Sequence, residues 1–308
     1  MALATSDRVQ ARRGTSAEST WGETPSSPAM TNFGLTSFNV NSGKTTVNST
    51  EIRADRMLPD IIQTGFEGSA DFGFEFKYGE YEWALESLFG RTFAGDTLLM
   101  GTQQISYLIE QEFSDIGRFK YLTGARCSQM SMNITARQVI NGTFNFLGKQ
   151  MFSVGTSRAG GSPTAASTNS IMNASTNVAS ITDNGVAISA PVRSLTININ
   201  GNLRPLDQIG SLALAQIGDG TFNVSGRIEI YFQDSTIYDK VLSHTTTALA
   251  FRTVDDAGQG YDWLFPAIKL TGDPNAAGQN QDVILPLDWA AKYDSTTGTM
   301  ARIIKLTY

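Results

Sequence analysis

An internal repeat constrains the fold of this chain more than any other feature of its sequence. In the first copy, residues 69–76 alternate between polar and apolar side chains, and residues 81–89 follow with helical spacing. In the second copy, 156 residues later, residues 225–232 alternate in the same way and residues 237–242 follow. A unit that recurs at a fixed offset is one supersecondary element used twice. The sequence therefore predicts two similar halves, each with a strand that leads into a helix.

Both expected helices carry an apolar stripe on one face. In the first, positions i, i+3, i+4 and i+7 are apolar and Gly90 can end the helix; the stripe consists of Tyr81, Ala84, Leu85 and Leu88. The second is shorter, and Asp234 is placed to cap it; its stripe consists of Ile237, Tyr238, Val241 and Leu242. Each apolar stripe is expected to cover a sheet.

Each helix is followed by segments that resemble a β-hairpin. The turns, residues 114–117 and 255–258, contain Asp and Gly, which suit tight connections. The strands that flank them are expected at residues 105–113 and 119–122 in the first half and at 249–254 and 261–270 in the second. Further strands are expected at residues 129–135, 142–147, 192–198, 282–287 and 301–307.

These elements predict a mainly β protein: a duplicated β-sandwich or barrel with flanking short α-helices and extended arms and loops. Hydrophobic residues make up 41% of the chain and charged residues only 17%, a balance that fits many short strands and turns. A sheet-and-helix unit alone would expose one apolar face. We therefore expect the two halves to pack as one fused domain.

The predicted organisation has four segments. The two halves of the fold span residues 33–152 and 191–308. Residues 1–32 lack periodicity and are expected to form a flexible N-terminal arm. Residues 153–190 are rich in Ser, Thr and Gly and are expected to be an insertion or linker. Flexible segments of this kind can become ordered on a neighbouring subunit.

The charge and cysteine content exclude several classes of protein. A formal net charge of −6 argues against a protein that grips nucleic acid by neutralising phosphates. The single cysteine, Cys127, excludes an intramolecular disulfide and is expected to fill the core. Residues 1–13 do not resemble a secretory signal, and no stretch is long and apolar enough for a membrane span. A soluble product made in the cytoplasm is expected.

Several residues resemble catalytic or binding motifs, and none makes a convincing site. The run 39–46 ends like a phosphate-binding loop, but Phe38 occupies the position of the required first glycine. His244 is the only histidine and has no evident partners for a triad. The aromatic residues of 72–78 fit a core face better than a base-stacking platform.

Acidic pairs offer a further alternative. Glu110 and Glu112 are expected on one strand face, and Asp255–Asp256 and Glu80/Glu82 are comparable pairs. Such residues could bind calcium or act as paired catalytic carboxylates, but no glycine-punctuated calcium loop surrounds them. They are more typical of a solvated strand face. No catalytic residue, cofactor or metal is therefore predicted.

With the repeat established, five runs carry a family resemblance. They are STEIRADRMLPD at 49–60, QTGFEGS at 63–69, GTFNFLG at 142–148, NQDVILPL at 280–287, and a last one made of Ala290, Lys292, Tyr293 and Asp294 followed by Gly298, Thr299 and Met300. Residues 33–308 resemble the tail tube (major tail) proteins of long non-contractile-tailed phages and of gene transfer agents. The long insertion at 153–190 departs from that pattern.

The resemblance implies a virion structural protein and not an enzyme. In such a protein, inner strands of six subunits close into a continuous barrel, and hexameric rings stack into a tube through which double-stranded DNA passes. Because this chain is duplicated, a six-subunit ring would look nearly twelvefold. Implied partners are further copies of the chain, a tape measure protein in the lumen, a tail terminator and a distal tail protein. The implied location is the tail of the virion.

Within such a tube, the acids on solvent-facing strand positions are candidates for lining the lumen: Asp71, Glu75 and Glu229. An acidic wall would repel phosphates and let DNA slide. The arm 1–32 and the segment 153–190 are expected to make contacts between rings.

Two other classes remain open from the sequence. One is another β-rich virion or secretion-tube component, such as a tail-tip or decoration protein, which would share the acidity and the lack of a site. The other is a secreted β-sandwich binding domain or hydrolase, which would need an export signal and a convergent polar site.

Overall fold

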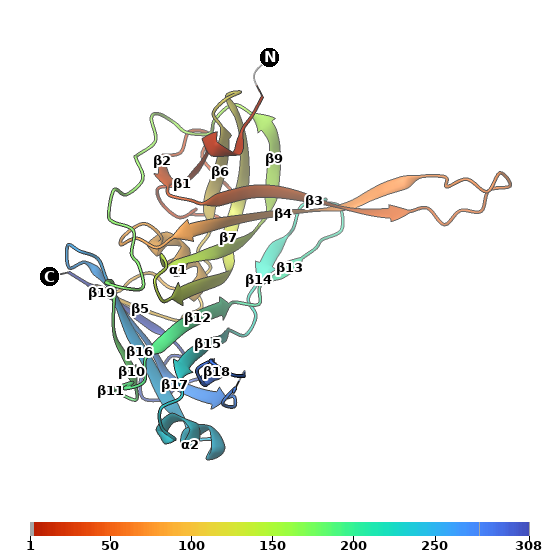
Figure 1. The fold of residues 1–308 in the computed structure, drawn as a ribbon. Helices are drawn as coiled ribbons and strands as arrows, with labels where there is room; N and C mark the ends of the chain where they lie inside the picture. Colours follow the sequence, from red (N-terminus) through yellow and green to blue (C-terminus); the bar gives the residue numbers. More distant parts are fainter. Residues whose placement is uncertain (1–2, 277, 308) are drawn as a thin grey trace.

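The chain is mainly β. A computed structural model describes residues 3–276 and 278–307, and Figure 1 shows its strands and two short α-helices. Apart from β13 (Arg204–Leu206) and β14 (Gln216–Gly218), which form a separate ribbon, the strands of the described residues form one hydrogen-bonded network of 17 strands. The fold class predicted from the alternating segments is confirmed.

The first half contributes four neighbouring antiparallel strands to a sheet that we call the inner sheet. β3 (Ser37–Asn48) pairs with β4 (Ile61–Glu75), β4 pairs with β8 (Asn141–Gly148), and β8 pairs with β7 (Arg118–Thr135). The residue pattern explains β4: Ala70, Phe72 and Phe74 are buried and alternate with more exposed positions.

The second half contributes four strands in the same order. β12 (Val192–Asn200) pairs with β15 (Asn223–Tyr231), β15 with β18 (Ile284–Ala291), and β18 with the end of β17 (Gly260–Thr271). A direct ladder between β7 and β12 joins the two sets. The inner sheet is therefore one continuous row of eight strands, in the order β3, β4, β8, β7, β12, β15, β18, β17.

The long strands β7 and β17 each leave the inner sheet and enter a second layer. In the first half that layer contains β1 (Val9–Gly14), β2 (Met30–Phe33), β6 (Tyr107–Phe113) and β9 (Gln150–Gly155). The second layer of the second half contains β16 (Thr247–Val254) and β19 (Arg302–Leu306). Strands from earlier in the chain join it: β5 (Thr97–Leu99) pairs with β19, β10 (Val178–Asp183) pairs with β16, and β11 (Val186–Ala187) pairs with β10. The two predicted hairpins are β6–β7 and β16–β17.

The helix α1 (Glu82–Phe89) lies where the two halves meet. Its predicted stripe is buried, and Gly90 ends it with φ of 62°, a left-handed conformation that glycine adopts without strain. The hydroxyl of Tyr261 on β17 donates to Glu82 at 3.0 Å, and Lys305 on β19 pairs with the same carboxylate at 2.6 Å. By contrast, α2 (Thr236–Leu242) has no fully buried residue and lies at the surface.

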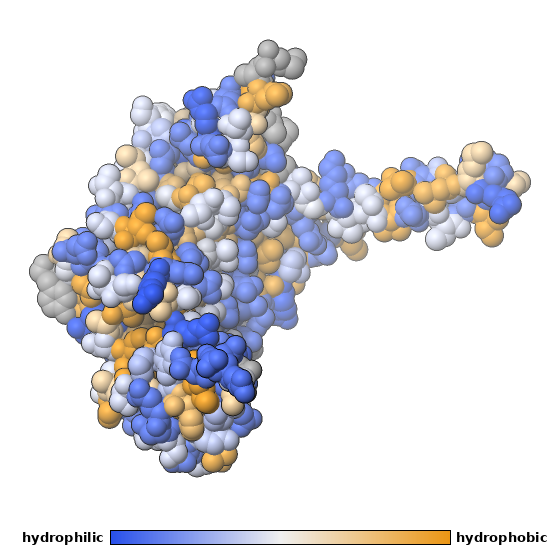
Figure 2. Space-filling model, in the orientation of Figure 1, coloured by the Kyte–Doolittle hydropathy of each residue, from blue (hydrophilic) through white to orange (hydrophobic). Residues whose placement is uncertain are grey.

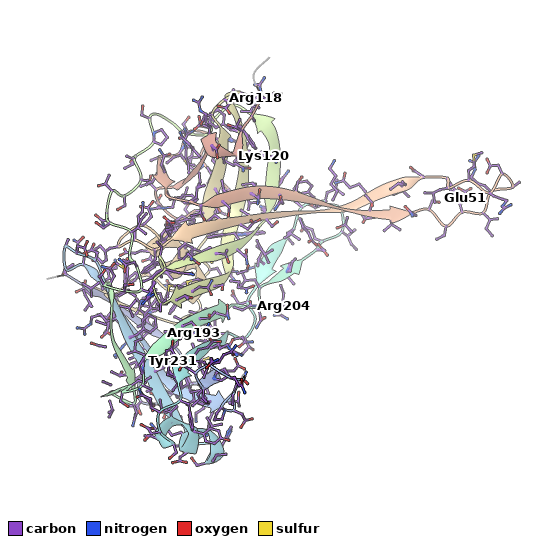
Figure 3. All side chains as sticks on the ribbon, in the orientation of Figure 1. Glu51, Arg118, Lys120, Arg193, Arg204 and Tyr231 are labelled. Atoms are coloured by element: carbon purple, nitrogen blue, oxygen red, sulfur yellow. The ribbon has the colours of Figure 1, made fainter. Side chains whose placement is uncertain are left out.

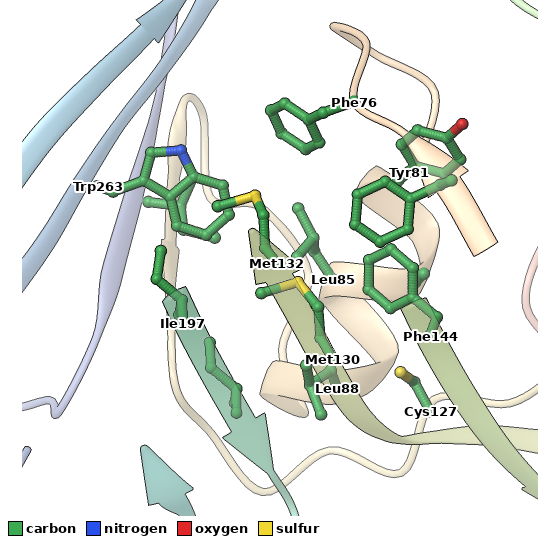
Figure 4. Packing of buried hydrophobic residues seen from close by; sticks show 14 of the residues in the cluster. Phe76, Tyr81, Leu85, Leu88, Cys127, Met130, Met132, Phe144, Ile197 and Trp263 are labelled. Carbon is green, nitrogen blue, oxygen red and sulfur yellow. The ribbon is translucent and has the colours of Figure 1, made fainter. Parts of the chain in front are cut away.

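One hydrophobic core serves both halves. Figure 4 shows Met130 and Met132 of β7 next to Ile197 of β12, with Trp263 of β17 on one side and α1 on the other. The rings of Phe76 and Trp263, one from each half, lie 6.0 Å apart. Cys127 is buried as expected, and burial raises the pKa of its thiol.

The N-terminal segment differs from the flexible arm expected over residues 1–32. Residues 9–14 form β1, which lies between β2 and β6. Arg12 on β1 pairs with Glu110 at 3.1 Å and also with Glu112, so the two acids predicted to share a strand face hold this strand. No local pattern indicates this strand because its charges are balanced by residues 98 and 100 positions away.

The segment 153–190 also differs from a free insertion. It includes the end of β9, then β10 and β11, and the residues between β9 and β10 cross from one half to the other. Glu110 accepts hydrogen bonds from Ser157 Oγ at 2.9 Å and from the Arg158 amide at 2.6 Å. Glu80 accepts one from the Ser167 amide at 2.8 Å. Buried carboxylates thus fix the path of this crossing.

Glu110 should therefore contribute strongly to stability. We expect Glu110→Gln to lower the free energy of unfolding by about 3 kcal/mol, because Arg12 then lacks its fully buried partner. Chemical denaturation measures this change. The control is Asp55→Asn, which breaks the exposed Arg53–Asp55 pair and should change stability by less than about 1 kcal/mol. Equal effects of the two substitutions would contradict this assignment.

Candidate functional site: the polar face and two edges of the inner sheet

The inner sheet has one face on the core and one polar face. On β4, Ser69, Asp71 and Glu75 point away from the core-facing phenylalanines. On β3, β7, β8 and β12 this face carries mostly small, neutral side chains: Asn39, Asn41, Gln129, Ser131, Asn133, Thr143, Asn145, Ser194, Thr196, Asn198 and Asn200. On β15 and β18 it carries Ser225 and the charged residues Arg227, Glu229 and Asp288. We call this surface the polar face.

The three acids singled out from the sequence all lie on the polar face, in two different environments. Asp71 accepts hydrogen bonds from the side-chain amides of Asn39 and Asn41, both at 3.2 Å. Within residues 3–276 and 278–307, neither Asp71 nor Glu75 has an ion pair. Glu229 does, because Arg227 lies 3.4 Å from it. Asp71 and Glu75 therefore give the face uncompensated negative charge, and Glu229 does not.

One end of the inner sheet is the outer edge of β3. In the described part of the chain, no strand pairs with this edge. Side chains instead form hydrogen bonds with its backbone amide and carbonyl groups. Gln111 donates to the carbonyl of Phe38 at 2.8 Å and accepts from the amide of Val40 at 3.4 Å. Lys120 donates to the carbonyl of Val40 at 3.4 Å. We call this the β3 edge.

The other end of the sheet lies just after β17. Residues 272–276 continue alongside β18, where Asn275 and Ile284 exchange two backbone hydrogen bonds of 2.8 and 3.3 Å. In the first half, Asn133 of β7 holds the same position beside Asn141 of β8. In the first half, β12 pairs with the side of β7 that faces away from β8. No described strand pairs with the corresponding side of residues 272–276. We call this the β17 edge.

A long two-stranded arm projects from the inner sheet. Residues 43–67, the distal parts of β3 and β4 with their connection, extend well beyond the body, and Glu51 lies near the tip (Figures 1 and 3). Figure 2 shows apolar patches along it. Ile52 is 97% exposed. The other exposed large apolar side chains of the arm are Val47, Met57, Leu58, Ile61 and Ile62.

A shorter extension occupies the equivalent place in the second half. Residues 201–222 connect β12 to β15 as the arm connects β3 to β4, and they contain the β13–β14 ribbon. Ile209 and Leu212 are exposed near its turn. Arg126 of β7 holds the base of this extension by donating to the carbonyl of Ile217 at 2.8 Å and by pairing with Asp219.

The remaining motif-like residues do not form a site. The run 39–46 lies in the extended strand β3, so its amides cannot wrap around a phosphate. His244 is exposed after α2. In the described part of the chain, no group of His, Cys, Asp and Glu could hold a metal ion. No helix among those residues has the length and hydrophobicity needed to span a membrane.

Comparison with known proteins gives one result. A family model described as phage tail tube protein matches residues 9–291, that is, from the first residue of β1 to the last of β18. The match covers both halves and the segment that connects them. None of the curated proteins compared shows significant similarity to the chain.

Proposed function

The chain belongs to the phage tail tube protein family, which makes it a structural protein of the virion tail and not an enzyme, and we propose that its copies form closed, stacked rings around a channel for DNA. The observation that carries this proposal is the inner sheet. It is continuous across both halves and polar on one face, and among the described residues no strand pairs with the outer side of β3 or of residues 272–276.

Ring closure follows from the two open ends. An unpaired strand edge invites association, and joining the β3 edge of one copy to the β17 edge of the next removes both. The contact is head-to-tail, and such contacts close into rings when the rotation at each junction fits. The apolar side of the sheet is already covered by its own core, so the polar face is the side available to line the channel.

The chemistry of the polar face suits the passage of DNA. Proteins hold duplex DNA mainly through Lys and Arg on its phosphates. This face offers mostly neutral Ser, Thr and Asn side chains, with Asp71 and Glu75 as uncompensated acids. It would repel phosphates and provide few groups to retain them. Glu229 and Asp288 would lie in the channel too, but Arg227 pairs with both.

Contacts between rings are best assigned to the arm of residues 43–67. The sequence pointed to residues 1–32 and 153–190, but most of these are fastened to their own subunit. The arm instead exposes Ile52, Met57 and Leu58, and exposed apolar groups of this kind mark protein contacts. A neighbouring ring is the partner proposed, and other tail proteins would meet the tube at its ends and inside it.

Electron microscopy of the purified protein tests the proposal. We expect hollow tubes or stacked rings to form as the concentration rises, because association satisfies both sheet edges. Monodisperse monomers at every concentration, and in the presence of the tail components that start assembly, would contradict it.

The role of the acids can be tested by reversing their charge. Virions with Asp71→Lys and Glu75→Lys should assemble but release DNA several-fold more slowly at low salt, because lysines in the channel attract phosphates; high salt should restore the rate. A fluorescent DNA dye follows release. The control is Asp96→Lys, the same charge change at an exposed turn just before β5 in the second layer. If the acid variants release DNA as fast as this control, the acids do not face the DNA.

The arm can be tested by shortening it. Thr46 and Gln63 pair in the β3–β4 ladder, so residues 47–62 can be replaced by Asn-Gly, which closes a two-residue hairpin. We expect the shortened protein to fold, with an unchanged circular dichroism spectrum, and to form single rings that do not stack. Tubes of normal length from this variant would show that the arm is not the stacking contact.

A further inference from the structure

We infer that three copies of this chain, and not six, close each ring, so that six similar halves surround the channel. This inference rests on the proposed tube function. It rests on one structural feature as well: the junction between halves that each chain already contains.

The β7–β12 ladder shows how one half joins the next. Seven residue pairs, from Gln129–Asn200 to Thr135–Ser194, connect the two halves within the chain. Each half contributes four inner strands, and the two sets have the same order and antiparallel sense. If every half joined the next half through the same kind of ladder, the repeated contact would close into a ring.

The β3 edge and the β17 edge are placed so that two neighbouring chains could pair as β7 and β12 do within one chain. Asn41 of β3 pairs with Ser69, as Asn198 of β12 pairs with Ser225, so β3 occupies the place of β12. On the other side, Asn275 lies beside Ile284 as Asn133 lies beside Asn141.

This equivalence predicts the register between chains. Within the chain, Thr196 of β12 pairs with Asn133 of β7. Asn39 takes the place of Thr196, two residues before Asn41, and Asn275 takes the place of Asn133. Asn39 of one copy should therefore lie opposite Asn275 of the next.

The number of strands decides between three copies and six. Each chain supplies eight inner strands, so three chains supply 24 and six supply 48. With strands about 4.8 Å apart and tilted by about 40°, a 24-stranded barrel has a backbone diameter of about 48 Å. Side chains that extend about 5 Å inward leave a channel of about 38 Å.

A channel of that width suits one DNA duplex. The duplex, with grooves about 8 Å deep on either side, is about 20 Å wide, so about 9 Å of water remains around it. Six chains would instead give a channel of about 86 Å by the same geometry, several times wider than the duplex. The duplication thus lets three chains form the wall that six single-unit chains would form.

The edges between chains are less regular than the junction within the chain. Gln111 and Lys120 occupy backbone groups of the β3 edge, and Pro274 has no amide hydrogen for a ladder on the β17 edge. Such features hinder premature pairing of free subunits. The ring should consequently alternate between two kinds of junction, which gives it threefold and not sixfold symmetry.

Chemical crosslinking counts the chains in a ring. Asn39→Cys and Asn275→Cys are introduced together at exposed positions, and assembled tubes are treated with a short bismaleimide. Cys127 is buried and should not react in the folded protein. On a denaturing gel, we expect bands of one, two and three chains and none larger. The two single-cysteine variants are the controls and should show no ladder.

Other results would overturn the inference. A ladder that continues to six chains would establish six-chain rings and leave the tube function intact. Tubes without any ladder would show that these two edges do not meet. Native mass spectrometry of rings released from tubes of the unmodified protein gives an independent count, for which we expect the mass of three chains. Failure of the unmodified protein to form rings or tubes under any condition would instead contradict the proposed function itself.

Discussion

The ladder between β7 and β12 is the interaction on which the rest of this structure depends. It joins two four-stranded sets into one inner sheet, and it brings Met130 and Met132 next to Ile197 in a shared core. Without it, each half would expose a strand edge and part of an apolar face. The same ladder leaves one open edge at each end of the sheet, so a single pairing explains both the fused fold and its capacity to assemble.

Carboxylates that accept several hydrogen bonds organise the parts that have no regular repeat. Glu18 accepts hydrogen bonds from the amides of Gly22 and Gly124, at 2.9 and 3.1 Å, and from the hydroxyl of Ser106 at 2.8 Å. Glu80 and Glu110 hold the crossing between halves in a similar way. Carboxylates with several donors can stabilise irregular backbone inside a protein because they leave few polar groups unpaired. Part of the acidity of the chain is therefore structural, and a smaller part lies on the polar face.

The sequence predicted secondary structure correctly where the signal comes from neighbouring residues. The alternation of residues 69–76 and the spacing of Tyr81, Ala84, Leu85 and Leu88 predicted β4 and α1, because period and capping are properties of neighbouring residues. The same alternation placed Asp71, Glu75 and Glu229 on one face. The strand β1 was missed because Arg12 is balanced only by distant Glu110 and Glu112. The arm was missed because its length depends on how far β3 and β4 stay paired beyond the body.

In the proposed tube, the polar face of the inner sheet lines the channel. A cryo-electron microscopy reconstruction of the assembled tube, at a resolution that shows side chains, tests it most directly. We expect Asp71, Ser131 and Thr196 to point into the lumen and α1 and α2 to lie outside the barrel. A tube in which the helices face the lumen, or in which the polar face lies on the outer surface, would contradict it.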